Sequence, residues 1–598
     1  MRELAVPAAY TIADDASLSD MVFDRAAQSP ESVPFQRPDA AGWTDVTARR
    51  FAEEVTALAK GLIGSGVEAG DRVAIMSGTR YEWVALDFAI WTVGAVTVAI
   101  YETSAAEQAR WILEDSGTKM LIVENDAYRE TTAPVVAELD TVTTVLQIDG
   151  DDGAIARLRA AGAEISDAQV EQRRSAVTAK DPATLVYTSG TTGRPKGVML
   201  THFNLLAESE TVADALGTMM VEGKSTLLFL PMAHIFARAI SVAGFYNRLT
   251  IGHTSDLTNL VPLLGTFKPT FVLSVPRVFE KVYNTAKQTA EDGGKGKIFA
   301  AAEATAIEWS QAQDTGGAGL LLNLKHKLFD KLVYGKLRAA LGGECEAAVS
   351  GGGPLGARLG HFFRGLGVTI YEGYGLTETS AAITVNRPGA QRVGSVGQPV
   401  SGNAVRISED GEVLLRGDVV FSEYWQNEQA TADDIRDGWF HTGDLGRLDE
   451  EGFLYITGRK KEIIVTAAGK NVAPSNLEDS IRAHPLISQA IVVGDGKPFI
   501  AALLTLDPES VPGWLERNGK PADTPIEKLV TDADLIAEVD AAVAAANAQV
   551  SRAEAIKKFR ILTTDFTMES GELTPTLKLK RNVVHDNYAQ QIAELYGA

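Results

Sequence analysis

Residues 187–197 read Tyr187-Thr188-Ser189-Gly190-Thr191-Thr192-Gly193-Arg194-Pro195-Lys196-Gly197 and directly follow a β-rich run at 183–187. Glycines let backbone N–H groups approach phosphate oxygens, and the threonines and the serine add short hydroxyl donors. Lys196 contributes a compact positive charge. The stretch therefore predicts a phosphate-binding loop.

The same loop is not a Walker A motif, which needs Gly-x-x-x-x-Gly-Lys-Ser/Thr at the start of a helix. Counted from Gly190, Pro195 replaces the second glycine and Gly197 replaces the magnesium-binding hydroxyl. Residues 198–200 predict a second strand, and a helix with Leu205, Val212 and Leu216 on one side begins only after Thr201-His202. We therefore expect a loop between two strands, with a ligand-free surface turn as the alternative.

Length and composition are those of a soluble globular protein with several cores. The 598 residues exceed what one core usually supports and predict about three or four structural units. The chain is 45% hydrophobic and 22% charged, which is ordinary for globular proteins. The longest apolar stretch, 83–98, contains Asp87 and Gly94 and falls short of the roughly 20 residues that a bilayer requires. We expect no membrane span and no secretory signal.

Charge and cysteine usage exclude several classes of function. A net charge of −22 repels nucleic acid and anionic lipid, and no basic patch large enough to reverse this is apparent, so we expect no nucleic-acid partner. The single cysteine, Cys345, excludes an internal disulfide, suits a reducing cytoplasm and is expected to be a buried filler. The eight histidines form no zinc motif, and there is no serine-hydrolase elbow.

Helical patterns alternate with β-rich runs over residues 44–123 and predict α/β layers with parallel strands. We expect helices at 51–61 and 83–94 and strands at 72–76 and 97–100. The same rhythm returns later, and a doubly wound sheet is the expected arrangement, with further strands at 227–229, 271–273, 347–349 and 368–371.

A change of texture predicts the domain organisation. Residues 393–457 show short strands with turns every eight to twelve residues or so, which indicates a small β subdomain. The basic segment 458–462 then precedes a renewed α/β pattern. We expect an N-terminal domain at 1–457, a hinge at 458–462 and a small mobile α/β domain at 458–598.

A second glycine cluster, Ser350-Gly351-Gly352-Gly353-Pro354-Leu355-Gly356, follows a predicted strand and satisfies Gly-x-Gly-x-x-Gly. Alone it would suggest a dinucleotide site, with Glu378 as a ribose-binding acid about 20 residues downstream. Pro354 and the late position in the chain weigh against that interpretation. A surface that a base approaches closely is favoured.

Residues 371–379 could serve a nucleotide in turn. Tyr374 offers a face for a purine, Thr377 a donor to phosphate, and Glu378 a hard oxygen ligand that suits Mg²⁺. A strand end with a capped helix is the alternative.

Two later segments offer further contacts. Asp444 follows a tight Thr-Gly turn and can accept hydrogen bonds from a ribose diol, and Arg459 could add a second contact; an Asx turn is the alternative. At 571–581, Lys578, Lys580 and Arg581 stand beside a proline-stiffened loop. By itself that segment indicates only an exposed basic loop.

Together and in this order, these segments resemble the adenylate-forming superfamily of acyl-CoA synthetases, peptide adenylation domains and luciferases. The resemblance covers nearly the whole chain. The segments are a phosphate loop (187–202), a substrate gate (231–238), adenine and magnesium segments (350–354 and 371–379), a ribose segment (438–446), a hinge (458–462) and a lysine loop (574–581). Within it, bacterial long-chain fatty acyl-CoA synthetases look most similar, through 230–236, 275–281, 469–474 and 573–576.

The resemblance implies a long-chain fatty acid:CoA ligase that uses ATP, Mg²⁺ and CoA. A fatty carboxylate attacks the α-phosphorus and expels pyrophosphate; the CoA thiol then attacks the acyl-adenylate and expels AMP. It assigns catalysis to Lys578, Lys196, Glu378 and His234, and Mg²⁺ to Glu378. Phosphate contacts fall to Thr188, Ser189, Gly190, Thr191, Thr192, Gly193, Lys196 and Thr377.

The same resemblance implies the remaining contacts. Adenine and ribose would be met by Gly351, Gly352, Gly353, Pro354, Tyr374, Gly375, Asp444 and Arg459. Lys461 would be the pivot of a domain rotation, which brings Gly469 and Lys470 to the CoA side. His234 and Phe236 would line the mouth of the acyl pocket, although His234 also suits a hydrogen-bonded core position. Leu577 replaces the usual glycine before the catalytic lysine, so Lys580 stays an alternative to Lys578.

Three other functions remain as alternatives. A fatty acyl-AMP ligase would load a carrier protein, but no obstructing segment is apparent after Asn471. A NAD-dependent oxidoreductase would leave Lys196 and Lys578 without a role, and a nucleotide sensor would not need Lys578. We expect a cytoplasmic protein with at most peripheral contact to the inner face of the membrane; chain-length preference and oligomeric state stay open.

Overall fold

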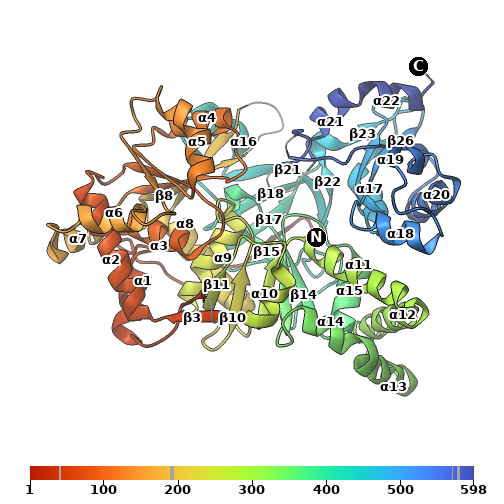
Figure 1. The fold of residues 1–598 in the computed structure, drawn as a ribbon, viewed down its shortest axis with the longest axis horizontal. Helices are drawn as coiled ribbons and strands as arrows, with labels where there is room; N and C mark the ends of the chain where they lie inside the picture. The colour runs from red at the N-terminus through yellow and green to blue at the C-terminus, as the bar shows by residue number, and fades with distance from the viewer. Residues whose placement is uncertain (40–41, 189–193, 569, 575–578, 598) are drawn as a thin grey trace.

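The computed structural model describes residues 1–39, 42–188, 194–568, 570–574 and 579–597. Four larger sheets and the helices around them make up the part before residue 460, and a separate group of strands and helices follows it (Figure 1). No helix within these ranges is long and apolar enough to cross a membrane. The mixed α/β architecture confirms the predicted fold class.

A seven-stranded sheet carries the predicted phosphate loop. Its order is β19-β9-β8-β5-β4-β6-β7, in which β8, β5, β4, β6 and β7 are parallel. The inner strands are buried along almost their whole length because helices cover both faces. The bounds are β4 (Arg72–Met76), β5 (Val96–Ile100), β6 (Met120–Val123), β7 (Thr144–Gln147), β8 (Pro182–Thr188), β9 (Lys196–Thr201) and β19 (Glu423–Tyr424).

The helices of this region confirm the predicted rhythm. The expected helices at 51–61 and 83–94 correspond to α2 (Ala48–Gly64) and α3 (Tyr81–Thr92), and the expected strand at 72–76 is β4. The others are α1 (Asp20–Gln28), α4 (Ala106–Ser116), α5 (Asp126–Val136), α6 (Ala154–Ala161), α7 (Asp167–Arg174), α8 (His202–Leu216) and α9 (Ile235–Tyr246).

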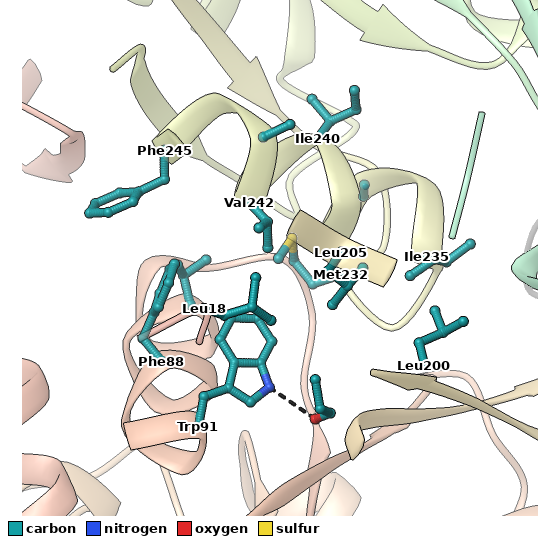
Figure 2. Packing of buried hydrophobic residues seen from close by; sticks show 14 of the residues in the cluster. Leu18, Phe88, Trp91, Leu200, Leu205, Met232, Ile235, Ile240, Val242 and Phe245 are labelled. Carbon is teal, nitrogen blue, oxygen red and sulfur yellow. Dashed lines mark hydrogen bonds between the residues drawn. The ribbon is translucent and has the colours of Figure 1, made fainter. Parts of the chain in front are cut away.

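Helix α3 lies in the middle of the largest core. Figure 2 shows Phe88 and Trp91 of α3 beside Val242 and Phe245 of α9. The rings of Phe88 and Phe245 are 5.1 Å apart, and the Trp91 indole N–H donates to the carbonyl of Ala183, 2.9 Å away. This packing fixes α9, which begins beside His234, against the sheet that ends in the phosphate loop.

The later strands do not join one doubly wound sheet, so that expectation is wrong. The expected strand at 227–229 becomes β10 (Ser225–Leu228) in a four-stranded sheet of order β10-β11-β2-β3, whereas those at 271–273, 347–349 and 368–371 enter a five-stranded sheet, β12-β13-β14-β15-β16. Pairing between segments far apart in the chain decides which sheet a strand joins, and the local hydrophobic period of a strand contains no information on its partners. The bounds are β2 (Phe35–Asp39), β3 (Gly42–Val46), β11 (Thr250–His253), β12 (Phe271–Ser274), β13 (Ala347–Ser350), β14 (Thr369–Tyr374), β15 (Thr384–Val385) and β16 (Gln398–Pro399).

Helices pack around the five-stranded sheet and extend to the lower right edge of the molecule (Figure 1). Cys345 lies just before β13 and is 3% exposed, which confirms the prediction of a buried residue. The helices are α10 (Leu260–Phe267), α11 (Pro276–Asp292), α12 (Gly296–Gln313), α13 (Leu320–Phe329), a π-helical turn (Asp330–Tyr334), α14 (Gly335–Ala340) and α15 (Ala357–Gly365).

The predicted β region forms a six-stranded sheet that also recruits the start of the chain. Strand β1 (Glu3–Ala5) pairs antiparallel with β17, with Leu4 opposite Val405. The other strands are β17 (Asn403–Ile407), β18 (Glu412–Gly417), β20 (Ile435–Arg436), β21 (Trp439–Leu448) and β22 (Leu454–Arg459), with α16 (Glu428–Asp434) before β20.

The C-terminal part has its own cores, drawn from residues 464–595. Its strands are β23 (Ile464–Val465), β24 (Asn471–Val472), β25 (Ile487–Val493), β26 (Ile500–Leu506) and β27 (Ile556–Ile561). Its helices are α17 (Pro474–Arg482), α18 (Val511–Arg517), α19 (Ile526–Leu529), α20 (Ala533–Asn547), α21 (Arg581–Asn587) and α22 (Ala589–Leu595).

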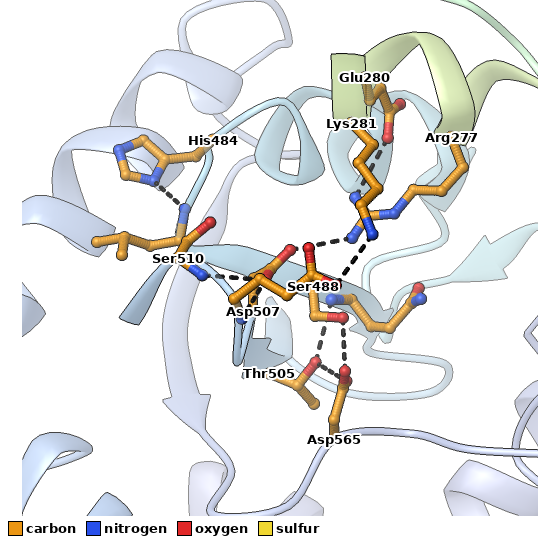
Figure 3. Close-up of polar contacts among 12 residues, drawn as sticks. Arg277, Glu280, Lys281, His484, Ser488, Thr505, Asp507, Ser510 and Asp565 are labelled. Carbon is orange, nitrogen blue, oxygen red and sulfur yellow. Dashed lines mark hydrogen bonds and ion pairs between the residues drawn. The ribbon is translucent and has the colours of Figure 1, made fainter. Parts of the chain in front are cut away.

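Ion pairs join this C-terminal part to α11. Arg277 lies 3.4 Å from Asp507, and Lys281 lies 2.9 Å from Glu509, as Figure 3 shows for the first pair. Both cations lie on α11, and both acids follow β26. The contact is polar, and such interfaces are typical of parts that move relative to one another.

Candidate active site

The ends of the phosphate loop face each other across β8 and β9. Thr188 pairs with Lys196 in the strand register, while Ser189, Gly190, Thr191, Thr192 and Gly193 lie outside the described residues. The Lys196 ammonium is 2.7 Å from Asp434 Oδ2 at the end of α16, and 3.9 Å from the centre of the Tyr424 ring. The hairpin confirms the loop between two strands that the sequence predicts.

Glu378 lies next to Lys196, Asp434 and Tyr424, in a short 3₁₀ turn, Thr377–Thr379, and is 8% exposed. The Tyr424 hydroxyl lies 3.0 Å from Glu378 Oε1 and 3.0 Å from Asp434 Oδ2, so it can donate to either carboxylate. Burial raises the pKa of Glu378, and the Lys196 charge opposes that rise. A backbone hydrogen bond from Phe421 to the Glu378 carbonyl holds the two segments together.

Sequence reasoning missed Tyr424 and Asp434. Tyr424 follows Glu378 by 46 residues, Asp434 lies further along the chain, and neither stands in a recognisable motif. Only the pairing of β19 with β9 brings Tyr424 beside the phosphate loop. No local signal in the sequence could have identified them.

The donor chemistry of this cluster fits Mg²⁺. The described residues contain no group of three or more histidine, cysteine or acidic side chains placed to hold a metal ion. Mg²⁺ bound to a nucleotide, however, needs only one or two carboxylates, since phosphates and water complete its shell. The Glu378 carboxylate is buried beside Tyr424, and its role as the magnesium ligand stays a prediction.

Asp444, predicted to contact ribose, is 4% exposed and lies beside Arg459, the second predicted ribose contact, and Tyr374, the predicted purine contact. Asp444 and Arg459 are partners in the β21–β22 register, and the Arg459 Nε lies 3.0 Å from Asp444 Oδ1. The Tyr374 hydroxyl at the end of β14 donates to Asp444 Oδ2 over 2.6 Å. Burial and the Asp444 charge raise the pKa of Tyr374 well above its usual range, so the phenol stays a donor.

The glycine cluster meets the predicted substrate gate. A side chain at Gly351 would place its Cβ 3.1 Å from the Phe236 ring, so any larger residue would push that ring away by a few tenths of an ångström. Gly352, Gly353 and Pro354 follow directly, and Gly352 has a φ of +80°. A Cβ at Gly375 would lie 1.4 Å from the carbonyl oxygen of Ala381, which only glycine avoids.

His234 caps α9 at its N-terminus. Its Nδ1 accepts a hydrogen bond from the Phe236 backbone N–H over 3.1 Å. The same helix is anchored below by Arg238, which is fully buried and paired with Asp87. His234 therefore has a structural contact, while its place at the helix start leaves it next to the Gly351–Phe236 contact.

The predicted C-terminal contacts lie on the C-terminal part. Lys578 lies outside the described residues, and the backbone N–H of its neighbour Lys580 donates to Glu572 O over 2.7 Å. Gly469 has a φ of +77° in the β23–β24 turn, and Lys470 pairs with Glu554 at 3.2 Å. Lys461 lies in the 3₁₀ turn that links β22 to β23.

Comparisons with known proteins agree with this arrangement. Residues 22–425 match the AMP-binding enzyme family, and residues 461–598 match the AMP-binding enzyme C-terminal domain. The long-chain-fatty-acid–CoA ligase FadD15 of Mycobacterium tuberculosis is 57% identical over 100% of both chains. The long-chain-fatty-acid–CoA ligase ACSBG2 of Gallus gallus is 32% identical, over 93% of this chain and 78% of its own.

Solved structures share the fold. The adenylation domain of a carboxylate reductase from Mycobacterium chelonae superposes with a TM-score of 0.74 at 21% identity, covering 98% of this chain and 91% of its own. A fatty acyl CoA synthetase of Mycobacterium tuberculosis gives a TM-score of 0.61 at 22% identity, covering 96% and 99%. The chain therefore belongs to the AMP-binding enzyme family, the adenylate-forming superfamily that its ordered motifs resemble.

Proposed function

We propose that this protein is an ATP-dependent long-chain-fatty-acid–CoA ligase. One observation carries the proposal: the chain is 57% identical, over the full length of both proteins, to ligases of that name. The described geometry supports the proposal, because it offers Lys196 on the β8–β9 hairpin, the buried Glu378 carboxylate and the buried Asp444 carboxylate.

In the first step, a carboxylate oxygen of the fatty acid attacks the α-phosphorus of ATP, and the bond to pyrophosphate breaks. Lys196 would hold the departing phosphates after exchanging its contact with Asp434 for a contact with phosphate. Thr188, Thr377 and the loop residues Ser189, Gly190, Thr191, Thr192 and Gly193 would add donors. Mg²⁺ held at Glu378 would neutralise charge on the phosphates.

The nucleoside would lie between β14 and β21. Asp444, oriented by Tyr374 and Arg459, would accept from the ribose hydroxyls. The backbone of Gly351, Gly352, Gly353 and Pro354, together with Gly375, would lie along the adenine.

In the second step, the CoA sulfur attacks the acyl carbonyl, and the bond to AMP breaks. We infer that Lys578 serves the first step and that the turn with Gly469 and Lys470 serves the second. A rotation about Lys461 would exchange the two segments, with 1–457 and 458–598 as the moving domains and 393–457 as the β subdomain. His234 would close the acyl pocket beside Phe236.

The experiment that tests the function supplies ATP, Mg²⁺ and palmitate with and without CoA, and follows AMP and thioester. Palmitoyl-CoA formed only when CoA is present is the expected result. Adenylate that accumulates without thioester would instead support the second candidate, a fatty acyl-AMP ligase, which the full-length identity to CoA ligases does not favour. Failure to release pyrophosphate would refute both.

The cellular placement is also a proposal. We infer a cytoplasmic enzyme that contacts the inner face of the membrane peripherally, since its substrate is apolar. Fractionation of cells into soluble, salt-washed and membrane fractions tests this: release of the protein by salt is expected, whereas release by detergent alone would contradict it.

A further inference from the structure

Helix α13 (Leu320–Phe329) exposes four of its five leucines, and the fifth, Leu322, is half-buried. The leucines at i, i+1, i+4 and i+8 form one stripe along the helix. These are also among the most exposed large apolar side chains of the described residues: Leu320 is 77% exposed, Leu321 83%, Leu324 56% and Leu328 56%. Leu332, 51% exposed, continues the stripe into the π-helical turn.

The opposite face of α13 is the one that packs, and it is largely polar and aromatic. His326 stacks on Trp309 of α12 with ring centres 4.3 Å apart, and its Nε2 lies 2.5 Å from the Gly365 carbonyl. Asn323 Oδ1 accepts from the Trp309 indole over 2.9 Å. An ordinary surface helix has the reverse arrangement, with leucines inside and polar groups outside. The outward leucines are therefore a consequence of how the helix is anchored.

Unpaired cations flank the leucine stripe. Lys325, Lys327, Lys331 and Lys336 are all exposed, and none of them forms an ion pair with any residue that the structure describes. At 100° per residue, Lys325 falls beyond one edge of the stripe and Lys327 beyond the other. Residues 320–336 hold these four lysines and one acid, a balance of +3, although the whole chain carries −22.

The one acid in this segment does not neutralise the lysines. Asp330 pairs with Arg338 of α14 at 2.7 Å and points to that side of the helix. The sequence analysis found no basic patch large enough to attract an anionic partner, and these lysines become a local cluster only once the helix is placed in the fold.

We propose that α13 docks on an anionic lipid surface, with its leucines among the acyl chains and its lysines at the lipid phosphates. A short helix with an apolar stripe bordered by lysines has the chemistry of an interfacial membrane anchor. A second copy of the chain is the poorer partner, because a self-complementary contact through this stripe would bring like charges together. Figure 1 shows α13 at the lower right edge of the molecule, away from the C-terminal part, where a flat surface can reach it.

Vesicle flotation tests the proposal without any ligase assay. Vesicles of phosphatidylethanolamine with phosphatidylglycerol should carry the wild-type protein, and pure phosphatidylcholine should carry far less. Since each lysine at such a surface contributes roughly fivefold in affinity, the variant Lys325→Gln/Lys327→Gln/Lys331→Gln should bind on the order of a hundredfold more weakly. Leu321→Ser/Leu324→Ser should also lose binding, whereas Ile536→Ser, on the exposed side of α20, should bind like wild type.

A label distinguishes insertion from mere attraction. The only cysteine, Cys345, is buried, so Leu324→Cys in a Cys345→Ser background places a polarity-sensitive fluorophore on the stripe. Its emission should shift to the blue with anionic vesicles, while the same label at Ile536→Cys should not respond. Unchanged flotation of both α13 variants, or no shift at position 324, would overturn the proposal. A concentration-dependent dimer that Leu321→Ser/Leu324→Ser abolishes, with no vesicle binding, would assign the face to a second copy.

Discussion

The buried pair of Asp87 and Arg238 should be a major determinant of stability beneath the active site. Arg238 is fully buried, and its Nε lies 2.7 Å from Asp87 Oδ2; Nη2 reaches Oδ1, and Nη1 donates to Thr184. Replacement by Met would leave the Asp87 carboxylate 2% exposed, with Thr97 as its remaining donor among the described residues. Loss of one partner of such a pair costs about 3–5 kcal/mol, so Arg238→Met should lower the free energy of unfolding by that amount.

A matched control separates burial from charge. The pair of Arg49 and Glu31 is equally short, 2.6 Å, but its side chains are 59% and 75% exposed. Arg49→Met should therefore cost less than about 1 kcal/mol. The double variant Asp87→Leu/Arg238→Met should recover much of the loss, because apolar pairs of similar size replace buried ion pairs at little cost.

Urea unfolding followed by tryptophan fluorescence measures these free energies. Trp83 and Trp91, two of the eight tryptophans, flank the Arg238 guanidinium at 5.0 and 5.3 Å, so part of the signal comes from the surroundings of the pair. An Arg238→Met variant no less stable than Arg49→Met would refute the reasoning. So would a double variant whose loss equals the sum of the two single losses.

Three further outcomes follow from individual contacts. Burial raises the pKa of Glu208 to about 8, so between about pH 4.5 and 8 the folded state binds more protons than the unfolded state. The free energy of unfolding should therefore fall with rising pH in this range, by at most about 1.4 kcal/mol per pH unit. Urea titrations of Glu208→Gln should no longer show that slope. Tyr374→Phe removes the hydrogen bond to Asp444 and should raise the KM for ATP roughly threefold to tenfold in a pyrophosphate-release assay, and an unchanged KM would exclude this tyrosine from the ribose site. The double variant Arg277→Gln/Lys281→Gln removes two ion pairs to the C-terminal part and should speed proteolysis at 458–462. High salt should have the same effect on the wild type. Equal cleavage rates would show that these pairs do not restrain the C-terminal part.

Local patterns predicted the elements that depend on local order. After Arg72, strand β4 (Arg72–Met76) is an apolar run that is buried on both faces, and its predicted bounds are those observed. Helix α2 keeps a 3.6-residue apolar period and was predicted three residues short at each end. The pairing of β1 with β17 was not predicted, since Leu4 and Val405 share no local signal and meet only through the folded sheet.

The candidate site divides in the same way. Glu378, Asp444 and Lys196 stand in glycine-rich or hydroxyl-rich segments, whose special backbone requirements leave a mark in the sequence. Tyr424 and Asp434 act through long-range contacts with Glu378 and Lys196, and single aromatic or acidic residues carry no such mark. Partners of a motif therefore had to come from the structure.

Those two residues alter the electrostatics of the phosphate site. Lys196 is not a free cation, because it forms an ion pair with Asp434 and lies over the Tyr424 ring. The hydroxyl of the same tyrosine contacts Glu378. Two carboxylates beside one ammonium leave the cluster with a negative balance, which opposes a polyphosphate. Glu378 would hold Mg²⁺, which would reverse that balance and allow Lys196 to exchange Asp434 for the phosphates. On this proposal Asp434 and Tyr424 hold the lysine in place before the nucleotide binds, and its transfer to the phosphates would depend on metal-bound nucleotide.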